Sequence, residues 1–510
     1  MINLTTTNEK AVPLRHPYEF FIGGKWQKPS SDSVIHVIDS TSEERAFSVA
    51  EAQAADMDAA VTAAREAFDR GPWPRMTHAE RADHLRAIAA GLRERGADVA
   101  QIWPRESGTI YSLAQGAAAG AARVFDFYAG FADTFAFEEP AMTGLVGSSR
   151  STGPSTGRDF GLLVREAVGV VGAIIPWNVP LGILCAALPA ALIAGCTVIV
   201  KSSPEAPGEG LLFAEVAEAV GLPPGVVNVV TADREVSELL VRDHRVDKII
   251  FTGSTATGRR IGSICGERIA RCTLELGGKS AAVILDDADI TTAAQYLAAA
   301  ELPMTGQMCS SLTRIVVPSA KHDEFVEVLA SSFAGVRVGD PYDPATQMGP
   351  LASERQRDRV ESYIAKGGAE GAVLAIGGGR PKHLERGWFV EPTVFGNVDN
   401  RSTIAQEEIF GPVLSVIPAD DEEQAIEIAN DTIYGLNAAV FTNDSDRARQ
   451  VAGRLQSGTV GQNGFKTDFG VAFGGFKQSG IGREGGTEGL LSFLETKTIV
   501  LDDAPARYRD

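Results

Sequence analysis

The order of apolar and polar positions predicts an α/β protein whose chain passes through three kinds of pattern. Residues 17–50 alternate apolar and polar side chains around a Gly-Gly pair, which is typical of short antiparallel strands. Residues 55–131 place apolar side chains three and four positions apart, which predicts helices. From residue 162 onward, apolar runs alternate with helical segments, and this alternation favours a parallel, doubly wound sheet.

The strands of this sheet are expected at the apolar runs 168–175, 196–200, 226–230 and 248–251. The helices between them are expected at 209–220, 236–242 and 257–270. A second α/β series follows residue 275, with strands expected at 281–285, 313–317, 373–376 and 413–417.

The longest apolar stretch, residues 179–200, raises the question of a membrane span. It is interrupted by Pro180, Gly182, Pro189 and Gly195. Such breaks divide the stretch into a helix, a turn and a strand, as in a buried α/β layer. The first fifteen residues are polar and lack the apolar core of a secretory signal. We therefore expect a cytoplasmic protein with no membrane partner.

The composition narrows the classes of function. A chain of 510 residues exceeds one ordinary core, so two or three domains are expected. The net charge of −19 argues against nucleic acid as a partner. The five cysteines include no CxxC pair, which favours reduced thiols. The seven histidines are scattered, so neither a Cys-His dyad nor a metal site has support.

Polar motifs suited to a nucleotide follow two of the predicted strands. After the strand at 248–251 come Gly253, Ser254 and Gly258, at the start of a predicted helix. A helix start presents unpaired N–H groups that suit a pyrophosphate, although an ordinary strand-to-helix turn has the same composition. Lys201 ends another strand at the sheet edge where nucleotides bind, or it only marks the strand end.

Three reactive side chains stand in turns. Cys309, in a Gly-containing turn, could attack an aldehyde as a thiolate, whereas a single cysteine is more often a small buried hydrophobe. Glu275 ends an apolar strand before a Gly-Gly pair and is either a general base or a solvated strand end. Asn178 follows a Pro-Trp pair and either donates to an oxyanion or forms the turn.

Together these motifs resemble those of the aldehyde dehydrogenase superfamily, over about residues 18–500. The motifs are Pro176-Trp177-Asn178, the segment from Lys201, Phe251–Gly258, Glu275–Lys279, Gly306–Cys309, Glu407–Pro412 and Phe473–Gly485. The resemblance implies a Rossmann-type cofactor domain, an α/β catalytic domain and a β arm that joins subunits. It also implies oxidation of an aldehyde to the carboxylic acid, with NAD⁺ as cofactor and NADP⁺ as an alternative.

The resemblance assigns roles to individual residues. Cys309 would be the nucleophile that forms a thiohemiacetal and a thioester, and Glu275 would activate the deacylating water. Asn178 and the Cys309 N–H would form the oxyanion hole. The cofactor would be lined by Ile175, Pro176, Trp177, Lys201, Ser203, Glu205, Gly253, Ser254, Thr257, Leu276, Glu408 and Phe410.

The same resemblance outlines a substrate pocket. It would include Val179, Gly182, Ile183, Ala186, Met308, Ser310, Phe465 and Phe469. These side chains are small or mainly apolar, which favours a medium or bulky hydrophobic or aromatic aldehyde.

The domain limits follow from the same match. Residues 1–137 and 161–275 would form the cofactor domain, 138–160 the arm, 276–480 the catalytic domain, and 481–510 a return to the cofactor domain with an oligomerisation strand. The strand-like runs 162–167 and 497–501 are expected to lack partners in their own subunit and to pair with another. A homodimer or homotetramer with a two-fold interface is therefore expected.

Two departures from the family pattern affect these expectations. Many NAD-preferring members carry a glutamate three residues after the lysine, where this chain has Pro204, followed by Glu205. We expect NAD⁺ to be preferred with measurable use of NADP⁺, because a carboxylate repels a 2′-phosphate. Ala187 stands where some members have a lysine proposed to relay protons with the residue matching Glu484, so this relay stays open.

Other functions remain to be separated from this one. A CoA-acylating semialdehyde dehydrogenase has the same fold but typically lacks a glutamate at the position of Glu275. A non-catalytic structural relative would be expected to have lost Cys309, which this chain retains. A cysteine hydrolase would need a histidine near the thiol, and none is adjacent in sequence.

Overall fold

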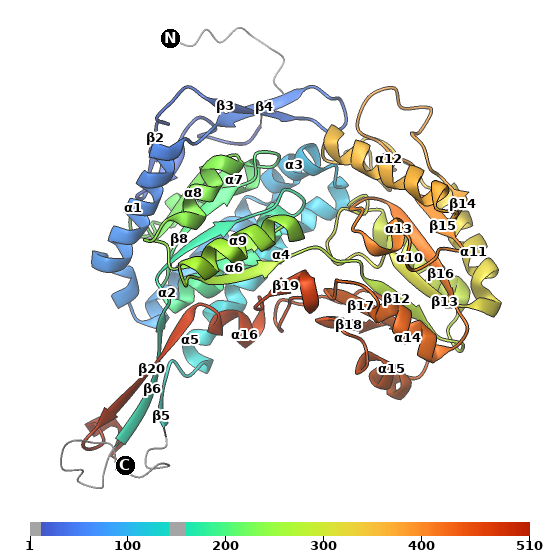
Figure 1. Cartoon of the computed structure of the whole chain (residues 1–510). Coiled ribbons are helices and arrows are strands. Elements are labelled where there is room, and N and C mark those ends of the chain that lie inside the picture. Colours follow the sequence, from blue (N-terminus) through green and yellow to red (C-terminus); the bar gives the residue numbers. More distant parts are fainter. Residues whose placement is uncertain (1–11, 142–159, 510) are drawn as a thin grey trace.

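A computed structural model describes residues 12–141 and 160–509, which form two α/β lobes and a β arm that projects away from them (Figure 1). The first lobe contains an eight-stranded sheet in the order β19-β11-β10-β7-β8-β9-β1-β2. Its five central strands are parallel: β7 (Val170–Ile174), β8 (Thr197–Ser202), β9 (Val227–Thr231), β10 (Lys248–Thr252) and β11 (Arg271–Glu275). Its edges are β1 (Phe20–Ile22), β2 (Lys25–Gln27) and β19 (Gly480–Ile481).

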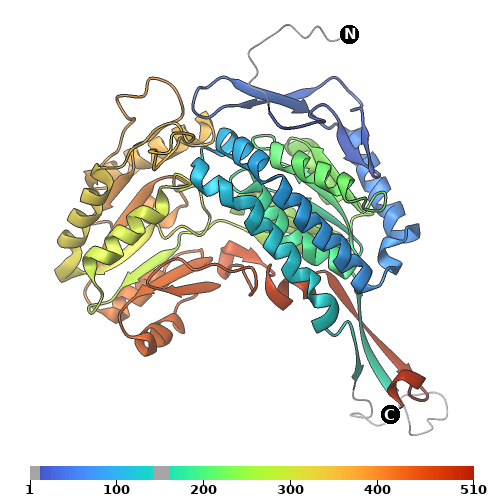
Figure 2. The ribbon, with the colours of Figure 1, turned by 180° about the vertical axis from the view of Figure 1, so that it is seen from behind.

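Helices cover both faces of this sheet. Successive residues of a strand point to opposite faces, and β8 follows this rule: Val198 and Val200 pack in one core and Ile199 in the other. The first core is closed by α2 (His78–Glu94), α3 (Gly96–Ser107), α4 (Tyr111–Ala129), α6 (Pro180–Ala194) and α7 (Gly208–Ala219), some of which Figure 2 shows from behind. The second is closed by α1 (Ala54–Arg70), α8 (Arg234–Arg242) and α9 (Thr255–Glu267).

The long apolar stretch divides as the sequence predicts. Pro180 begins α6, where its missing N–H costs nothing. Gly195 ends the helix at a φ of 100°, which favours glycine, and β8 follows at once. Both elements are buried within the first lobe. In the described part of the chain, no helix is both long enough and apolar enough to cross a membrane.

The second lobe contains a seven-stranded sheet in the order β14-β15-β16-β13-β12-β17-β18, parallel except for β14. Its strands are β12 (Ala281–Ile284), β13 (Arg314–Pro318), β14 (Val373–Ile376), β15 (Thr393–Gly396), β16 (Val413–Ala419), β17 (Asn437–Phe441) and β18 (Thr459–Gln462). Its helices are α10 (Ile290–Glu301), α11 (His322–Ala334), α12 (Glu354–Ala369), α13 (Thr403–Gln406), α14 (Glu422–Asn430) and α15 (Ser445–Ala452). The α/β fold class is therefore as predicted.

The arm corrects one expectation. Its sheet has the order β20-β6-β5, with β5 (Glu138–Ala141), β6 (Phe160–Ala167) and β20 (Leu494–Leu501). β20 pairs with β6 along eight residues, so the two runs expected to lack partners in their own subunit pair with each other. The arm residues 142–159 lie outside the described residues.

The remaining elements are short. β3 (Val34–Ile38) and β4 (Arg45–Ala50) form a two-stranded sheet, and α5 (Phe131–Thr134) and α16 (Gly486–Leu491) are single turns or little more. Short 3-10 turns lie at Trp73–Arg75, Ser319–Lys321, Lys477–Ser479 and Ala506–Tyr508.

Candidate active site

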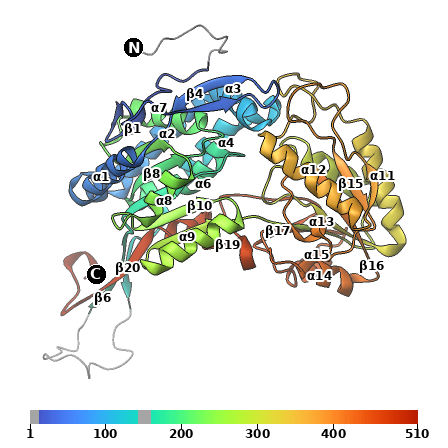
Figure 3. The same ribbon diagram turned by 45° about the horizontal axis from the view of Figure 1, so that its top comes forward.

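The polar motifs gather where the strand order of the first sheet reverses. The chain runs from β7 through β8 to β9 on one side, whereas β10 lies on the other side of β7. Such a reversal leaves a crevice at the carboxyl ends of the strands, where ligands bind in doubly wound sheets. Residues 175–178 follow β7 at this edge, and Gly253 and Ser254 follow β10. Figure 3 shows this lobe beside the second one.

The turn after β10 leaves no room for larger side chains. A Cβ atom on Gly253 would lie 2.5 Å from the Phe251 ring, and one on Gly258 would lie 2.4 Å from the Leu276 side chain. Ser254 caps α9 by accepting a hydrogen bond from the Thr257 N–H. The helix start is thus packed closely against the end of β10 and the segment after β11.

A charged group stands at the end of β8. The Lys201 side chain is buried. Burial lowers the pKa of its ammonium to about 8, although the nearby carboxylates of Glu205 and Asp233 partly raise it. Glu205 accepts hydrogen bonds from the Ser203 hydroxyl at 2.5 Å and from Arg355 Nη2 at 2.9 Å. Sequence reasoning missed Arg355, which comes from the other lobe.

The facing wall of the crevice is built from the second lobe. Glu408 accepts a hydrogen bond from the Gly278 N–H at 3.1 Å, and burial raises the pKa of its carboxyl to about 7. The rings of Trp177 and Phe410 meet edge to face with centroids 5.4 Å apart. Phe410 has a φ of 62°, an uncommon conformation for a bulky residue that marks a constrained turn.

Cys309 lies in a tightly packed turn between α10 and β13. Gly306 has a φ of 66°, and a Cβ there would lie 2.3 Å from the Gly411 backbone. A Cβ on Gly278 would lie 2.4 Å from the Cys309 carbonyl oxygen, so the turn after Glu275 packs on the cysteine backbone. Burial raises the pKa of the Cys309 thiol to about 12, and the charges of Glu408 and Glu275 add to the effect.

A closed ring of hydrogen bonds fixes Asn178. Its Nδ2 donates to the Gln307 carbonyl oxygen at 2.9 Å, and Gln307 Nε2 donates to the Ser107 carbonyl oxygen at 3.0 Å. The Ser107 hydroxyl donates to the Trp103 carbonyl oxygen at 3.0 Å, and Trp103 Nε1 donates to the Asn178 carbonyl oxygen at 2.8 Å. The end of α3 therefore joins the asparagine to the cysteine turn, a link that sequence reasoning missed.

Two buried carboxyls, Glu275 near the cysteine and Glu484 near Glu275, lack hydrogen-bond partners among the described residues. Glu275 and Glu484 are each 3% exposed. Among the described residues, none of their four carboxyl oxygens has a hydrogen-bond partner. Burial and mutual repulsion raise the pKa of Glu275 well above its usual value, and burial raises that of Glu484 to about 7. Carboxyls held in this way can accept or release protons near neutral pH.

A cavity of about 560 Å³ opens between α4, the start of α6 and the segment before β19. Of the predicted pocket residues, Val179, Gly182 and Phe469 line it. The other lining residues are Trp103, Leu113, Gly116, Ala117, Gly120, Ala121, Arg123, Val124, Phe127, Leu181, Glu209, Thr467, Asp468 and Gly470. The surface is mainly apolar, and eight of the seventeen lining residues come from α4, which sequence reasoning did not assign to the site.

The remaining predicted pocket residues are not part of this lining. Ala186 and Ser310 are buried, and Ile183 is partly buried within α6. Met308 packs against the cluster that contains Trp103, and Phe465 packs against the core between α10 and the second sheet. No group of His, Cys, Asp or Glu side chains suited to a metal ion occurs within residues 12–141 and 160–509.

Known proteins share both the sequence and this architecture. The sequence model of the aldehyde dehydrogenase family matches residues 26–499. Geranial dehydrogenase from Castellaniella defragrans is 42% identical over 482 residues, covering 94% of this chain and 98% of that protein. 3-Succinoylsemialdehyde-pyridine dehydrogenase from a Pseudomonas species is 40% identical and covers 96% of this chain and 99% of that protein.

Solved structures agree. An aldehyde dehydrogenase of Mycobacterium tuberculosis complexed with NAD⁺ has a TM-score of 0.91 and 44% identity, covering 95% of this chain and 98% of that one. A mutant of aldehyde dehydrogenase C from Pseudomonas syringae, complexed with NAD⁺ and octanal, has a TM-score of 0.91 and 36% identity, covering 97% and 99%. The chain therefore belongs to the aldehyde dehydrogenase family. It is an NAD(P)-dependent enzyme that oxidises an aldehyde, with NAD⁺ as its cofactor.

Proposed function

We propose that the chain oxidises an aldehyde with a medium-length or bulky apolar body to its carboxylic acid, through a thioester on Cys309. The observation that carries this proposal is the link between Asn178 and the cysteine turn, with Glu275 buried nearby and free of hydrogen-bond partners among the described residues. A thiol, an amide donor and a carboxyl with a raised pKa are the groups that such chemistry needs.

The residues of the crevice fit NAD⁺. Gly253 and Gly258 let Phe251 and Leu276 pack against the turn at the start of α9, whose N–H groups suit a pyrophosphate, and Lys201 supplies a donor at the end of β8. Glu408 and Phe410 would bound the nicotinamide end, beside Trp177. The bound nicotinamide supplies the hydride acceptor for the oxidation.

The first half of the reaction forms the thioester. The Cys309 thiolate adds to the carbonyl carbon of the aldehyde, and the oxygen takes the negative charge. The second N–H of Asn178 Nδ2 and the Cys309 backbone N–H stabilise this oxyanion, because the first N–H is already held by Gln307. Loss of hydride from the tetrahedral carbon restores the C=O bond and leaves an acyl group on sulfur.

The second half releases the acid. Glu275 takes a proton from water, the resulting hydroxide adds to the thioester carbon, and the C–S bond breaks to return the thiolate. The raised pKa of Glu275 makes the carboxylate a stronger base than an exposed glutamate. Glu484 is buried beside it, but Ala187 stands where a lysine would complete the relay with Glu484, so no step is assigned to Glu484.

The cavity supports the substrate class. Its lining is mainly apolar, and Gly116 and Gly120 leave width along α4. Two similar proteins carry names or ligands of the same kind: one is called geranial dehydrogenase, and another was crystallised with octanal. An unbranched or branched aliphatic aldehyde with several carbon atoms suits this cavity.

The domain limits predicted from the sequence are part of the proposal. The first sheet with its helices would be the cofactor domain, interrupted by the arm at 138–160, and 276–480 would be the catalytic domain. β19 supports the return of the chain, because it pairs with β11 of the first sheet. The outer edges of β5 and β20 would pair with another copy, in a homodimer or homotetramer.

A panel of aldehydes tests the proposed function. NADH formation is followed for short-chain, long-chain, branched and aromatic aldehydes, with and without CoA and with Cys309→Ala as control. We expect turnover without CoA and the highest kcat/KM for aldehydes with apolar chains. A strict need for CoA would contradict hydrolytic release, and equal rates with short polar aldehydes would contradict the substrate class.

A further inference from the structure

An ion pair joins the two lobes next to the end of β8. Arg355, the second residue of α12, donates from Nη2 to Oε1 of Glu205 at 2.9 Å, although the two residues are 150 positions apart. The Arg355 side chain is 62% exposed and the Glu205 side chain 29%. An exposed ion pair of this kind contributes little to the free energy of folding. We therefore ask which ligand the two side chains could contact.

The end of β8 is the place where a doubly wound sheet distinguishes its dinucleotides. β7 and β8 are the first and second strands of the nucleotide-binding unit. In such units, an acidic residue at the end of the second strand accepts hydrogen bonds from the adenosine ribose, and an arginine nearby accommodates a 2′-phosphate. Glu205 is the acid in this position, which makes Arg355 a candidate for the second role. This placement rests on the proposed binding of NAD⁺ in the crevice.

The charges around this position nearly cancel. Lys201 and Arg355 are the cations, and Glu205 and Asp233 are the carboxylates. Both oxygens of Glu205 are already engaged, one by Arg355 and the other by the Ser203 hydroxyl. The ribose of NAD⁺ is neutral and would lie among two cations and two carboxylates. The 2′-phosphate of NADP⁺ would be repelled by the two carboxylates and would need contact with both cations to bind.

We propose that Arg355 is a cofactor-selecting residue, which holds Glu205 toward the ribose of NAD⁺ and binds the 2′-phosphate when NADP⁺ replaces it. The guanidinium presents several N–H donors in a planar fork that matches phosphate oxygens. Its exposure leaves donors available for that contact. Selection between the two cofactors therefore depends on a residue of the second lobe as well as on the first.

The two members of the pair should act in opposite directions. Glu205→Gln removes the negative charge and frees Arg355, so NADP⁺ affinity should rise about tenfold, in the range for a hydrogen bond to a charged group. Arg355→Gln in the wild-type background should lower NADP⁺ affinity, and it should lower NAD⁺ affinity by less than about threefold because the Ser203 hydroxyl still holds Glu205. Arg355→Gln added to Glu205→Gln should remove the gain.

Calorimetric titration with NAD⁺ and NADP⁺ measures these affinities without turnover, and kcat/KM for both cofactors gives a second readout. Arg380→Gln is the matched control, because Arg380 forms an exposed ion pair with Glu361, which lies on α12 like Arg355. An unchanged ratio of the two cofactors in Arg355→Gln, or no gain of NADP⁺ binding in Glu205→Gln, would overturn the inference. Neither result would affect the proposed chemistry, which fails separately if Cys309→Ala retains turnover.

Discussion

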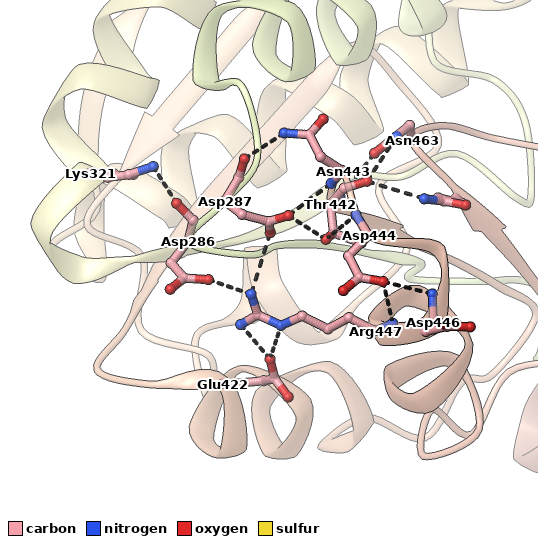
Figure 4. Close-up of polar contacts among 11 residues, drawn as sticks. Asp286, Asp287, Lys321, Glu422, Thr442, Asn443, Asp444, Asp446, Arg447 and Asn463 are labelled. Carbon is pink, nitrogen blue, oxygen red and sulfur yellow. Dashed lines mark hydrogen bonds and ion pairs between the residues drawn. The ribbon is translucent and has the colours of Figure 1, made fainter.

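The two ends of β12 differ in how their polar groups are satisfied. At its carboxyl end, Asp286 and Asp287 enter an exposed network with Arg447 (Figure 4). At its amino end lie the buried Glu275 and Lys279, and their charged atoms have no hydrogen-bond partners among the described residues. One end of β12 therefore has charged groups that are hydrogen-bonded, and the other end has buried charged groups without hydrogen-bond partners among the described residues.

The network at the carboxyl end is built for stability. Arg447 donates to Asp286 at 2.6 Å and to Glu422 at 2.8 Å. Asp287 accepts from the Thr442 hydroxyl and the Asn443 N–H, at 2.7 and 2.9 Å. Hydrogen bonds from Arg447 lower the pKa of Asp286, as expected for a carboxylate that stays charged.

The amino end has the opposite character. Burial lowers the pKa of Lys279 to about 7, and burial with repulsion from Glu484 raises the pKa of Glu275. A buried polar group without a partner costs free energy of folding. Proteins retain buried charged groups without partners mainly where function requires them. The free-energy cost at the amino end of β12 therefore indicates that this end is the reactive one.

The largest effect is expected from Cys309→Ala. Turnover should fall to the background rate, because none of the other described cysteines lies in the crevice: three are buried and Cys272 is on β11. Thermal unfolding should be nearly unchanged, since the substitution removes one sulfur atom. Assay of NADH formation together with calorimetry checks both parts. Substantial residual turnover would show that another group is the nucleophile.

The pH dependence of the thiol should also be large. With the pKa of Cys309 raised to about 12, the thiolate fraction without cofactor grows as pH rises. The rate of alkylation of Cys309 by iodoacetamide should therefore increase about tenfold per pH unit, without a plateau below about pH 9. Peptide mass spectrometry follows the reaction at this residue alone. A plateau near pH 7 would contradict the raised pKa.

A moderate effect is expected from Trp103→Phe. This change removes the N–H that holds the Asn178 backbone carbonyl, so the Asn178 backbone loses one anchor, and it also replaces the buried indole with a smaller ring. We expect kcat to fall about threefold to tenfold, the range of one net hydrogen bond, with KM for NAD⁺ unchanged. Steady-state kinetics separate the two constants. An equal rise in KM for NAD⁺ would indicate a general disturbance of the fold instead.

The smallest effect on activity is expected at the other end of β12. Arg447→Ala should lower the free energy of unfolding by about 1 kcal/mol, because the network is exposed and partly screened. The kinetic constants should stay at the parent values. Urea unfolding and the NADH assay provide the two measurements. A clear loss of kcat would break the separation between a stabilising end and a reactive end.

Local patterns predicted much of this architecture. Proline and glycine positions divided residues 179–200 into α6, a turn and β8. Apolar runs located the parallel strands of the first sheet, and glycine-rich turns located Cys309 and Glu275. These features are local in sequence, because turns and strands depend on neighbouring residues.

The features that were missed depend on contacts between distant segments. Trp103 reaches Asn178 across 75 positions and Arg355 reaches Glu205 across 150, and neither contact follows from spacing. The pairing of β20 with β6 was missed for the same reason. The cavity lining from α4 was missed because its small residues are also typical of helix packing.

The most direct test of the central claim is the fate of the acyl group in Glu275→Gln. After mixing with NAD⁺ and a reactive aldehyde, this variant should release a burst of about one NADH per site and then turn over at least a hundredfold more slowly than the parent. Intact-protein mass should show the acyl group, carried on the Cys309 peptide. Two results would contradict the assignment of Glu275 to thioester hydrolysis. One is loss of both the burst and the steady-state turnover, and the other is steady-state turnover equal to that of the parent.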